Sequence, residues 1–374
     1  MGEAGTGSVT VDRMRSLPRP RPEPEFYAAT LEEGFRRFPA RRENYARYRA
    51  AARGELVDYL PVRLDVENVS RCNFHCTMCQ VSDWPGYQRA GDMSLEDYRA
   101  LLDAQEGVVE IKLQGMGEPL LGACYAEMVA YARQRAIWVR STTNGSLLHL
   151  QDNYKRVIDA DICELQVSID GATPQTYEAI RRGGRFAKVT ENCLLLNRYC
   201  SQAGRRRTRM WAVAQAANFR ELERFPALAA SLGFDRLTFS LDLNDWGQTA
   251  WRQRNDPQDI HGRVDAALAE HLAGLGRAQG VEVTFWFIDE KYDPAETTKL
   301  CPWPFERVYV SSDMRIVPCC MIANPEVVDL GDARTLREAW NGDRMAAFRR
   351  AHLRGEIPDV CRSCYRNGAA ETRA

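Results

Sequence analysis

Three cysteines, Cys72, Cys76 and Cys79, lie within one short stretch with the spacing C-x3-C-x2-C. The stretch follows a strand-like run at 62–67, so a single loop can bring three thiolates to one site. Soft thiolates select zinc, cuprous copper or an iron–sulfur cluster. Three protein ligands leave one metal position open for a substrate or cofactor. The alternatives are unliganded buried cysteines or structural zinc. Zinc prefers four protein ligands, and His75 inside the loop would reach the same metal awkwardly.

A second set of cysteines closes the chain, with the spacing C-x17-C-x41-C-x2-C, and consists of Cys301, Cys319, Cys361 and Cys364. Two short alternating runs around Ser311-Ser312-Asp313 predict a β-hairpin, and a helix is expected at 335–353. Four thiolates can fully ligate one cluster, but they can also form a structural zinc site, and spacing alone does not decide. The chain has 12 cysteines, and the grouping favours metal chemistry over disulfides.

Strands alternate with helices between these two sets. The expected strands are 62–67, 109–114, 137–142, 163–169, 209–215 and 236–241, and the expected helices are 94–105, 123–135, 153–159, 173–200 and 219–232. A crossover helix fits between each pair of strands, which is typical of βαβ units on a parallel sheet. A helix at 259–279 and a strand at 281–287 are expected to end this domain. Six units are too few for a closed eight-fold barrel.

The cysteine loop after a first strand resembles the signature of radical S-adenosylmethionine (SAM) enzymes. The resemblance implies an α/β fold with a partial (β/α)6 barrel and an active site at the carboxyl ends of the strands. It also implies a [4Fe–4S] cluster whose open iron chelates SAM. One electron from that cluster cleaves SAM to a 5′-deoxyadenosyl radical.

Further motifs follow the later strands in the order of that family. Gly115-Met116-Gly117-Glu118-Pro119 resembles its Gly-Gly-Glu-Pro element, with Met116 as the departure. Its glycines allow close backbone approach, and Glu118 offers an acceptor for the ammonium group of SAM. The simpler alternative is a strand-to-helix turn.

The resemblance assigns other SAM contacts residue by residue. Asn144 would lie near the ribose, Ser168 and Arg181 would hold the carboxylate, and Met78 would pack on adenine. Arg182 is a close rival of Arg181, and a bidentate arginine suits a carboxylate. Asn218, after the fifth strand, is expected to make a further polar contact.

The C-terminal region resembles the twitch domain, the shortened form of the SPASM domain, which carries one auxiliary [4Fe–4S] cluster. Its ligand spacing is similar to that of aminocyclitol oxidases of the 2-deoxy-scyllo-inosamine dehydrogenase type, and it favours Cys319 over Cys320 as a ligand. Met314 stands where a glycine is usual. Two [4Fe–4S] clusters and SAM are therefore the expected cofactors, with a flavodoxin or ferredoxin as the electron donor.

Two clusters suit the oxidation of a secondary alcohol on a sugar or aminocyclitol in an antibiotic-type pathway, because the second cluster can accept the substrate electron. Asp242 or Asp245 would accept the proton or bind a substrate amine. Redox-neutral epimerisation, with Cys320 as the hydrogen donor, is one alternative. Peptide maturation and a non-catalytic metal-stabilised binding protein are the others.

Composition sets the remaining expectations. The 374 residues carry a formal net charge of -1, which favours neither a nucleic-acid nor a membrane partner. No apolar run is long enough to span a membrane, and no signal peptide is apparent, so a cytoplasmic location is expected. We expect an N-terminal extension at 1–60, extended to about residue 25 and then helical, without the strands of a winged-helix peptide-binding domain. The barrel is expected at 61–290 and the auxiliary cluster domain at 291–374.

Overall fold

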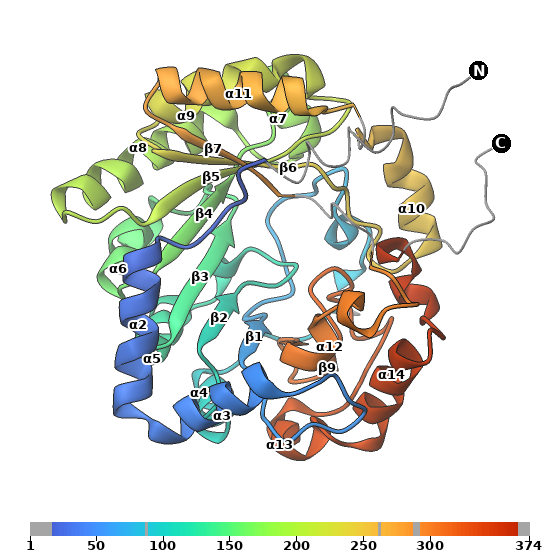
Figure 1. The fold of residues 1–374 in the computed structure, drawn as a ribbon. Coiled ribbons are helices and arrows are strands. Elements are labelled where there is room, and N and C mark those ends of the chain that lie inside the picture. Colours follow the sequence, from blue (N-terminus) through green and yellow to red (C-terminus); the bar gives the residue numbers. More distant parts are fainter. Residues whose placement is uncertain (1–16, 87–88, 261–262, 287–291, 366–374) are drawn as a thin grey trace, which may run out of the picture.

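The computed structural model describes residues 17–86, 89–260, 263–286 and 292–365, and these are built around one sheet (Figure 1). The strands run in the order β7-β6-β5-β4-β3-β2-β1-β8-β9, and all neighbours pair in parallel except β8 and β9. The first seven strands are β1 (Arg63–Val66), β2 (Glu110–Leu113), β3 (Trp138–Thr143), β4 (Glu164–Ser168), β5 (Thr208–Val213), β6 (Arg236–Ser240) and β7 (Glu282–Trp286). Each predicted strand is present, so the parallel α/β partial barrel expected from the sequence is confirmed.

Helices connect successive strands. They are α4 (Leu95–Ala104), α5 (Tyr125–Gln134), α6 (Asn153–Asp159), α7 (Pro174–Ile180), α8 (Phe186–Gln202), α9 (Phe225–Ser231), α10 (Thr249–Asn255) and α11 (Ala266–Ala278). The single helix expected at 173–200 is wrong, because Gly183 takes a left-handed conformation with φ +90° between α7 and α8. The helix expected at 259–279 begins only at Ala266, and α10 was not predicted.

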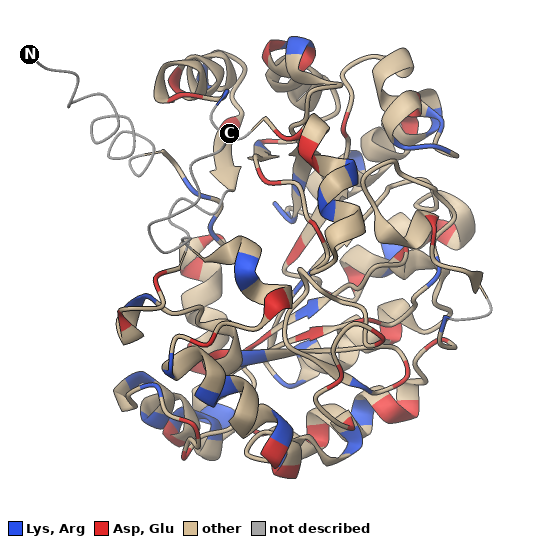
Figure 2. Ribbon diagram, turned by 90° about the vertical axis from the view of Figure 1, so that its right-hand side faces the viewer, with Lys and Arg blue, Asp and Glu red and all other residues tan. Residues whose placement is uncertain are grey.

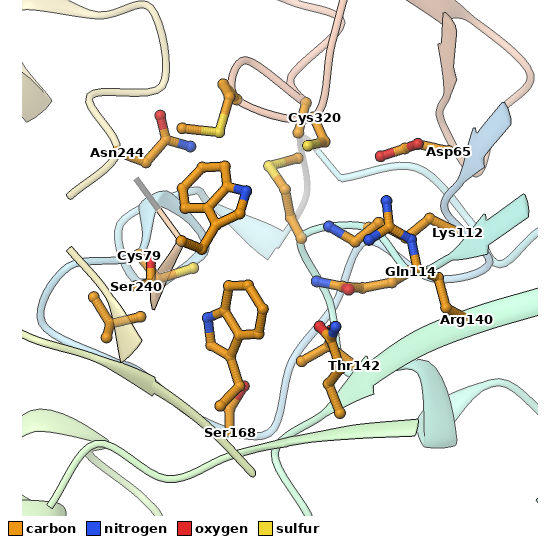
Figure 3. Close-up of a pocket in the computed structure, with 18 of the residues that line it drawn as sticks. Asp65, Cys79, Lys112, Gln114, Arg140, Thr142, Ser168, Ser240, Asn244 and Cys320 are labelled. Atoms are coloured by element: carbon orange, nitrogen blue, oxygen red, sulfur yellow. The ribbon is translucent and has the colours of Figure 1, made fainter. Parts of the chain in front are cut away.

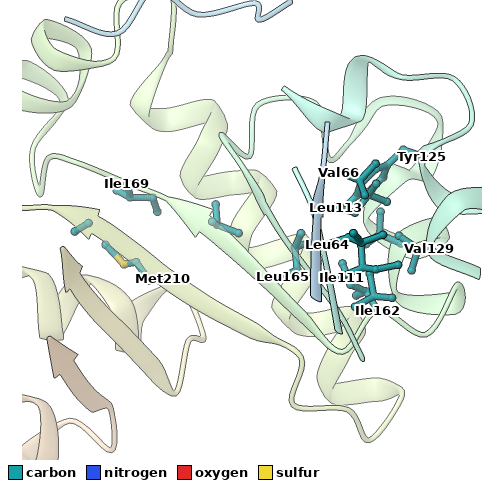
Figure 4. Close-up of a cluster of buried hydrophobic side chains, with 14 of the residues drawn as sticks. Leu64, Val66, Ile111, Leu113, Tyr125, Val129, Ile162, Leu165, Ile169 and Met210 are labelled. Carbon is teal, nitrogen blue, oxygen red and sulfur yellow. The ribbon is translucent and has the colours of Figure 1, made fainter. Parts of the chain in front are cut away.

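The two faces of the sheet differ in chemistry. Residues of one parity, such as Leu64, Ile111, Val139, Leu165 and Met210, are fully buried and pack against the outer helices (Figure 4). The residues that alternate with them along the strands are mostly polar, and they line a cavity. A parallel sheet that is packed on both faces reads as continuous apolar runs. The alternation seen here therefore marks one face that lines the cavity and is not packed into the apolar core.

The N-terminal segment crosses the inside of the sheet before it enters two helices, α2 (Pro24–Arg37) and α3 (Pro39–Ala50). The amide of Phe285 on β7 donates to the carbonyl of Pro18 at 2.8 Å, and Arg209 on β5 donates to the carbonyl of Arg21 at 3.0 Å. Residues 17–62 contain helices and no strand, as expected. The extended lead-in predicted for 1–25 falls partly outside the described residues, and α2 already begins at Pro24.

The C-terminal part joins the same sheet. Strand β8 (Arg307–Val310) pairs in parallel with β1, and the predicted hairpin is completed by β9 (Ile316–Val317). Met314, in the hairpin turn, has a φ of +68°, the left-handed conformation that glycine adopts most easily. The remaining helices are α12 (Trp303–Glu306), α13 (Leu336–Ala339) and α14 (Asp343–Leu353), so the helix predicted at 335–353 is interrupted near Gly342. Continuity of the sheet across the two parts was not predicted.

Positions of basic and acidic residues are interspersed along the helices of the ribbon (Figure 2). None of the helices in the described ranges has the length and apolar character that a bilayer-crossing helix needs.

Candidate active site

A cavity of about 950 Å³ lies on the polar face of the sheet. The cysteine loop, the carboxyl ends of the strands and the C-terminal hairpin region all contribute to its walls. Seven of the eight residues expected to contact SAM line this cavity, and Asn218 is the one that does not. The fold therefore brings together motifs that are far apart in the sequence.

The cysteine loop follows β1 and is fastened to the end of α7. The amide of His75 donates to the carbonyl of Arg182 at 2.8 Å, and the amide of Thr77 donates to that of Ile180 at 3.0 Å. This turns the His75 side chain out to solvent, while Cys72, Cys76 and Cys79 line the cavity. Among the described residues that line this space, three are thiols of the loop and none is a histidine.

Burial governs the ionisation of these thiols. It raises the pKa of both Cys72 and Cys79 to about 12 and also raises the pKa of Cys76. A thiol of this kind ionises when a metal coordinates it. In the described part of the chain, no group of three or more His, Cys, Asp or Glu side chains is arranged to hold a single metal ion.

The Gly-Met-Gly-Glu stretch packs directly on the cysteine loop. A Cβ on Gly117 would lie 2.4 Å from the carbonyl oxygens of Arg71 and Val69, so only glycine fits there. The amide of Glu118 donates to the carbonyl of Arg71 at 3.0 Å. A Cβ on Gly115 would lie 2.2 Å from Cγ of Glu67. Both glycines are thus required by close packing around the loop.

Glu118 is buried, and its carboxylate joins this stretch to the end of β3. It accepts from the Thr143 hydroxyl at 2.6 Å and from the Asn144 amide at 2.7 Å, while burial raises its pKa. The Asn144 side chain donates to Oδ1 of Asn73 in the cysteine loop at 2.9 Å. Both residues line the cavity and also hold the loop in place.

Arg181 and Ser168 both lie at the cavity, whereas Arg182 is exposed. Arg181 is buried and forms an ion pair with Asp170 at 2.7 Å. The carboxylate of Asp170 is the largest favourable influence on Arg181 and keeps its pKa raised. Sequence reasoning missed Asp170, although it stands in the same Ser-Ile-Asp-Gly motif as Ser168.

Asn218 does not line the cavity, so the expected cofactor contact is wrong. Its side chain is fully buried, donates to the carbonyls of Asp170 and Val213, and accepts from the Gln215 amide. It closes the turn after β5. Asp242 lines the cavity, whereas Asp245 is bound by Arg252 at 3.0 Å and lies outside the lining residues.

The four C-terminal cysteines gather at a second place. Cys319 is partly buried, and the pKa of its thiol is raised by burial, by the adjacent Cys320 and by Cys361, Cys301 and Cys364. Cys320 faces the other way, into the cavity. Burial raises the pKa of Cys320 to about 11, and its strongest charged neighbour is Lys112. Of these two adjacent cysteines, Cys320 lines the cavity and Cys319 does not.

Several cavity residues had no sequence signal. Arg19 and Arg21 reach it from the N-terminal segment, and Trp211 and Trp286 come from β5 and β7. Lys112 is the third of the four residues of β2 and lies outside every motif. For Lys112, Trp211 and Trp286, only the parity of the strands could have pointed to the cavity, because these residues occupy the positions that alternate with the apolar core.

Comparison with known families agrees with this geometry. The family described as the Radical SAM superfamily matches residues 69–205, and the iron-sulfur cluster-binding domain named SPASM matches residues 301–365. The chain therefore carries a radical SAM domain followed by a SPASM domain. Radical SAM enzymes catalyse radical chemistry. These domains imply three kinds of cofactor: SAM, a [4Fe–4S] cluster in the radical SAM domain, and additional iron–sulfur clusters in the SPASM domain.

Individual relatives are distant. The chain is 24% identical over 314 residues to the PqqA peptide cyclase of Granulibacter bethesdensis, covering 82% of this chain and 80% of that protein. It is 27% identical over 194 residues to the mycofactocin maturase MftC of Mycobacterium ulcerans, covering 52% of this chain and 51% of the maturase.

Solved structures share the fold. SuiB of Streptococcus suis bound to the precursor peptide SuiA matches with a TM-score of 0.62 at 14% identity, covering 77% of this chain and 66% of that chain. BtrN in complex with AdoMet and 2-DOIA gives a TM-score of 0.48 at 16% identity, over 82% of this chain and 93% of that one. The likeness to BtrN is too weak to support a substrate class.

Proposed function

We propose that the protein is a radical SAM enzyme that modifies a peptide. The observation that carries this proposal is the similarity to the PqqA peptide cyclase, which extends over 82% of this chain and 80% of the cyclase. SuiB, which shares the fold, is seen with a precursor peptide. These findings favour a peptide substrate over the sugar or aminocyclitol expected from the sequence.

The protein's own residues would position the cofactors as follows. Cys72, Cys76 and Cys79 hold a cluster that, when bound, supplies the electron that cleaves SAM to a 5′-deoxyadenosyl radical. Glu118 accepts the ammonium group of SAM, and Arg181 takes its carboxylate. Arg181 suits this task because its ion pair with Asp170 fixes the guanidinium while the residue still lines the cavity.

The remaining SAM contacts follow from position. Ser168 lines the same cavity as Arg181, Met78 lines it from within the cysteine loop, and Asn144 lines it while donating to Asn73 of that loop. The second set of cysteines would hold one auxiliary cluster, with Cys319 as a ligand and Cys320 excluded because it faces the cavity. A flavodoxin or ferredoxin would deliver the electrons.

Oxidation or epimerisation of a small polar molecule is the second candidate function. It is favoured by the polar cavity wall, which includes Asp65, Gln114 and Gln166. In oxidation of a secondary alcohol, Asp242 would accept the hydroxyl proton. In epimerisation, the Cys320 thiol would return a hydrogen atom to the substrate. Both residues line the cavity.

Mass spectrometry of products separates these functions. The reconstituted enzyme would be incubated without oxygen with SAM, a reductant and synthetic peptides encoded by short reading frames beside the gene. The proposal expects 5′-deoxyadenosine together with a peptide of changed mass or a new internal bond. A parallel panel of sugars and aminocyclitols, including 2-deoxy-scyllo-inosamine, serves as the competing arm. Conversion there, with every peptide unchanged, would favour the second function.

A further inference from the structure

One wall of the cavity carries more positive than negative charge. The polar positions of β1, β2, β3 and β8, together with the residue before β8, contain the cations Arg63, Lys112, Arg140 and Arg307 and the carboxylates Asp65, Glu110 and Glu306. Of these residues, Asp65, Lys112, Arg140 and Arg307 line the cavity, and the other three adjoin its lining through ion pairs. The seven residues together carry one net positive charge. A cleft lined by an excess of one sign attracts ligands of the opposite sign.

The three arginines of this wall already form ion pairs with carboxylates of the protein. Arg63 contacts Glu110 at 3.2 Å and Glu306 at 3.0 Å. Arg140 contacts the second oxygen of Glu110 at 3.0 Å, and Arg307 contacts Glu306 at 2.7 Å. Two buried glutamates thus hold three guanidinium groups in place, and this network forms a rigid base for the wall.

Lys112 is different. Within residues 17–365, as far as the structure describes them, its side-chain ammonium forms no hydrogen bond and no ion pair, although its backbone carbonyl accepts from the Gln114 amide at 3.1 Å. Asp65 is its neighbour in register on β1, yet the ion-pair contact of Asp65 is with Arg307, at 3.9 Å. Lys112 lines the cavity, and its ammonium is not among the buried polar atoms that are shielded from solvent. Figure 3 shows Lys112 beside Gln114 and Arg140 on one side of the cavity.

The opposite end of the curved sheet is aromatic. Trp211 on β5 and Trp286 on β7 line the cavity with their ring centroids 6.3 Å apart, and Trp246 lines it after β6. Strands β5 and β7 are separated from β2 by at least two strands of the sheet. The cavity therefore carries a group of indole rings at this end, while Trp138 and Trp303 line it nearer the cationic strands. Indole rings and cations in one cavity fit a substrate that carries an apolar group and an anionic group.

We propose that Lys112 binds a carboxylate of the substrate, with Arg140 beside it, while the tryptophans contact the neighbouring side chain. The inference rests on the proposed peptide substrate and narrows it to a segment that carries either the C-terminal carboxylate or an acidic side chain. An ammonium without a protein partner forms a charge-assisted hydrogen bond to a carboxylate at little cost in other contacts.

Binding of defined probes tests this without turnover. The probes are Ac-Ala-Tyr with a free carboxylate, the same dipeptide as its amide, and Ac-Glu-Tyr amide. D-glucuronate and D-glucose form a non-peptide pair. Each is titrated by saturation-transfer NMR into the anaerobically reconstituted, SAM-loaded enzyme. We expect one or both carboxylate peptides to bind about tenfold or more tighter than the neutral peptide. The stronger of the two identifies the source of the carboxylate.

Variants assign the effect to one side chain. Lys112→Met should abolish the preference for the carboxylate, and Lys112→Arg should retain most of it. Lys188→Met, on the outer surface of α8 where Lys188 pairs with Glu191, is the matched control and should bind like the wild type. Equal affinity for carboxylate and neutral probes, or a Lys112→Met enzyme that keeps the preference, would overturn the proposal. A preference for glucuronate over glucose that depends on Lys112, with no peptide bound, would retain the carboxylate subsite and reject the peptide substrate.

Discussion

Glu67 connects the radical SAM domain to the SPASM domain and should make stability depend on pH. Its carboxyl group accepts from the Met116 amide at 2.9 Å and from the Ser312 amide of the C-terminal hairpin at 3.3 Å. The side chain is buried, and that burial raises its pKa to about 7. The native state therefore favours the protonated acid more strongly than the unfolded chain does.

The sign and size follow from this shift. Stability from Glu67 is fully present below the unfolded pKa of about 4.5 and is lost as pH rises through the folded value of about 7. The loss approaches about 3 kcal/mol, of which about 2 kcal/mol falls between about pH 5.5 and pH 8. Glu67→Gln removes the ionisable group and should flatten the dependence of the free energy of unfolding on pH. The stability of the variant relative to the wild type should therefore increase as pH rises.

Urea unfolding measures this prediction. Free energies of unfolding would be compared at several pH values for the wild type, Glu67→Gln and the control Glu338→Gln, which changes an exposed glutamate on α13. The control should follow the wild type. If the difference between Glu67→Gln and the wild type stays constant from about pH 5.5 to pH 8, burial does not hold Glu67 in its neutral form and the reasoning fails.

Further predictions concern single residues of the two sites. Gly117→Ala places a Cβ against two carbonyl oxygens of the cysteine loop, so we expect it to destabilise the protein by about 2 kcal/mol or more and to lower iron content, as checked by unfolding and iron assay. Arg181→Lys should weaken SAM binding about tenfold in calorimetry because the bidentate contact is lost, whereas Arg182→Lys, at an exposed position, should leave it unchanged. Cys319→Ala should remove the auxiliary cluster, seen as a loss of about half the iron, whereas Cys320→Ala should keep the iron of the wild type.

Much of the scaffold could be predicted because its signals are local. Alternating apolar residues mark each strand, and the cysteine loop and the Gly-Met-Gly-Glu turn fix the end of the sheet at which the cavity lies. The split between α7 and α8 was missed because Gly183 and Gly184 lie within an otherwise continuous helical pattern. Two glycines there allow the left-handed turn that the pattern hides.

The substrate side of the site could not be predicted, for a different reason. Lys112, Arg140 and Trp211 stand in the middle of strands, and their role depends on which neighbours take up their charges or rings. Pairing between distant residues, such as β1 with β8 or Arg63 with Glu306, decides that, and no local pattern records it. Asn218 shows the opposite case. It lies near the expected strand end, but all the hydrogen bonds of its side chain are made within and beside its own turn, so it does not reach the cavity.

The most direct test of the account measures iron and SAM cleavage together after anaerobic reconstitution. The account predicts about eight irons per chain, as two four-iron clusters, and formation of 5′-deoxyadenosine with a reductant. A variant with Cys72, Cys76 and Cys79 all changed to Ala should keep about half of the iron and lose all SAM cleavage. A wild-type protein that takes up zinc in place of iron, or one that leaves SAM intact under reducing conditions, would contradict the account.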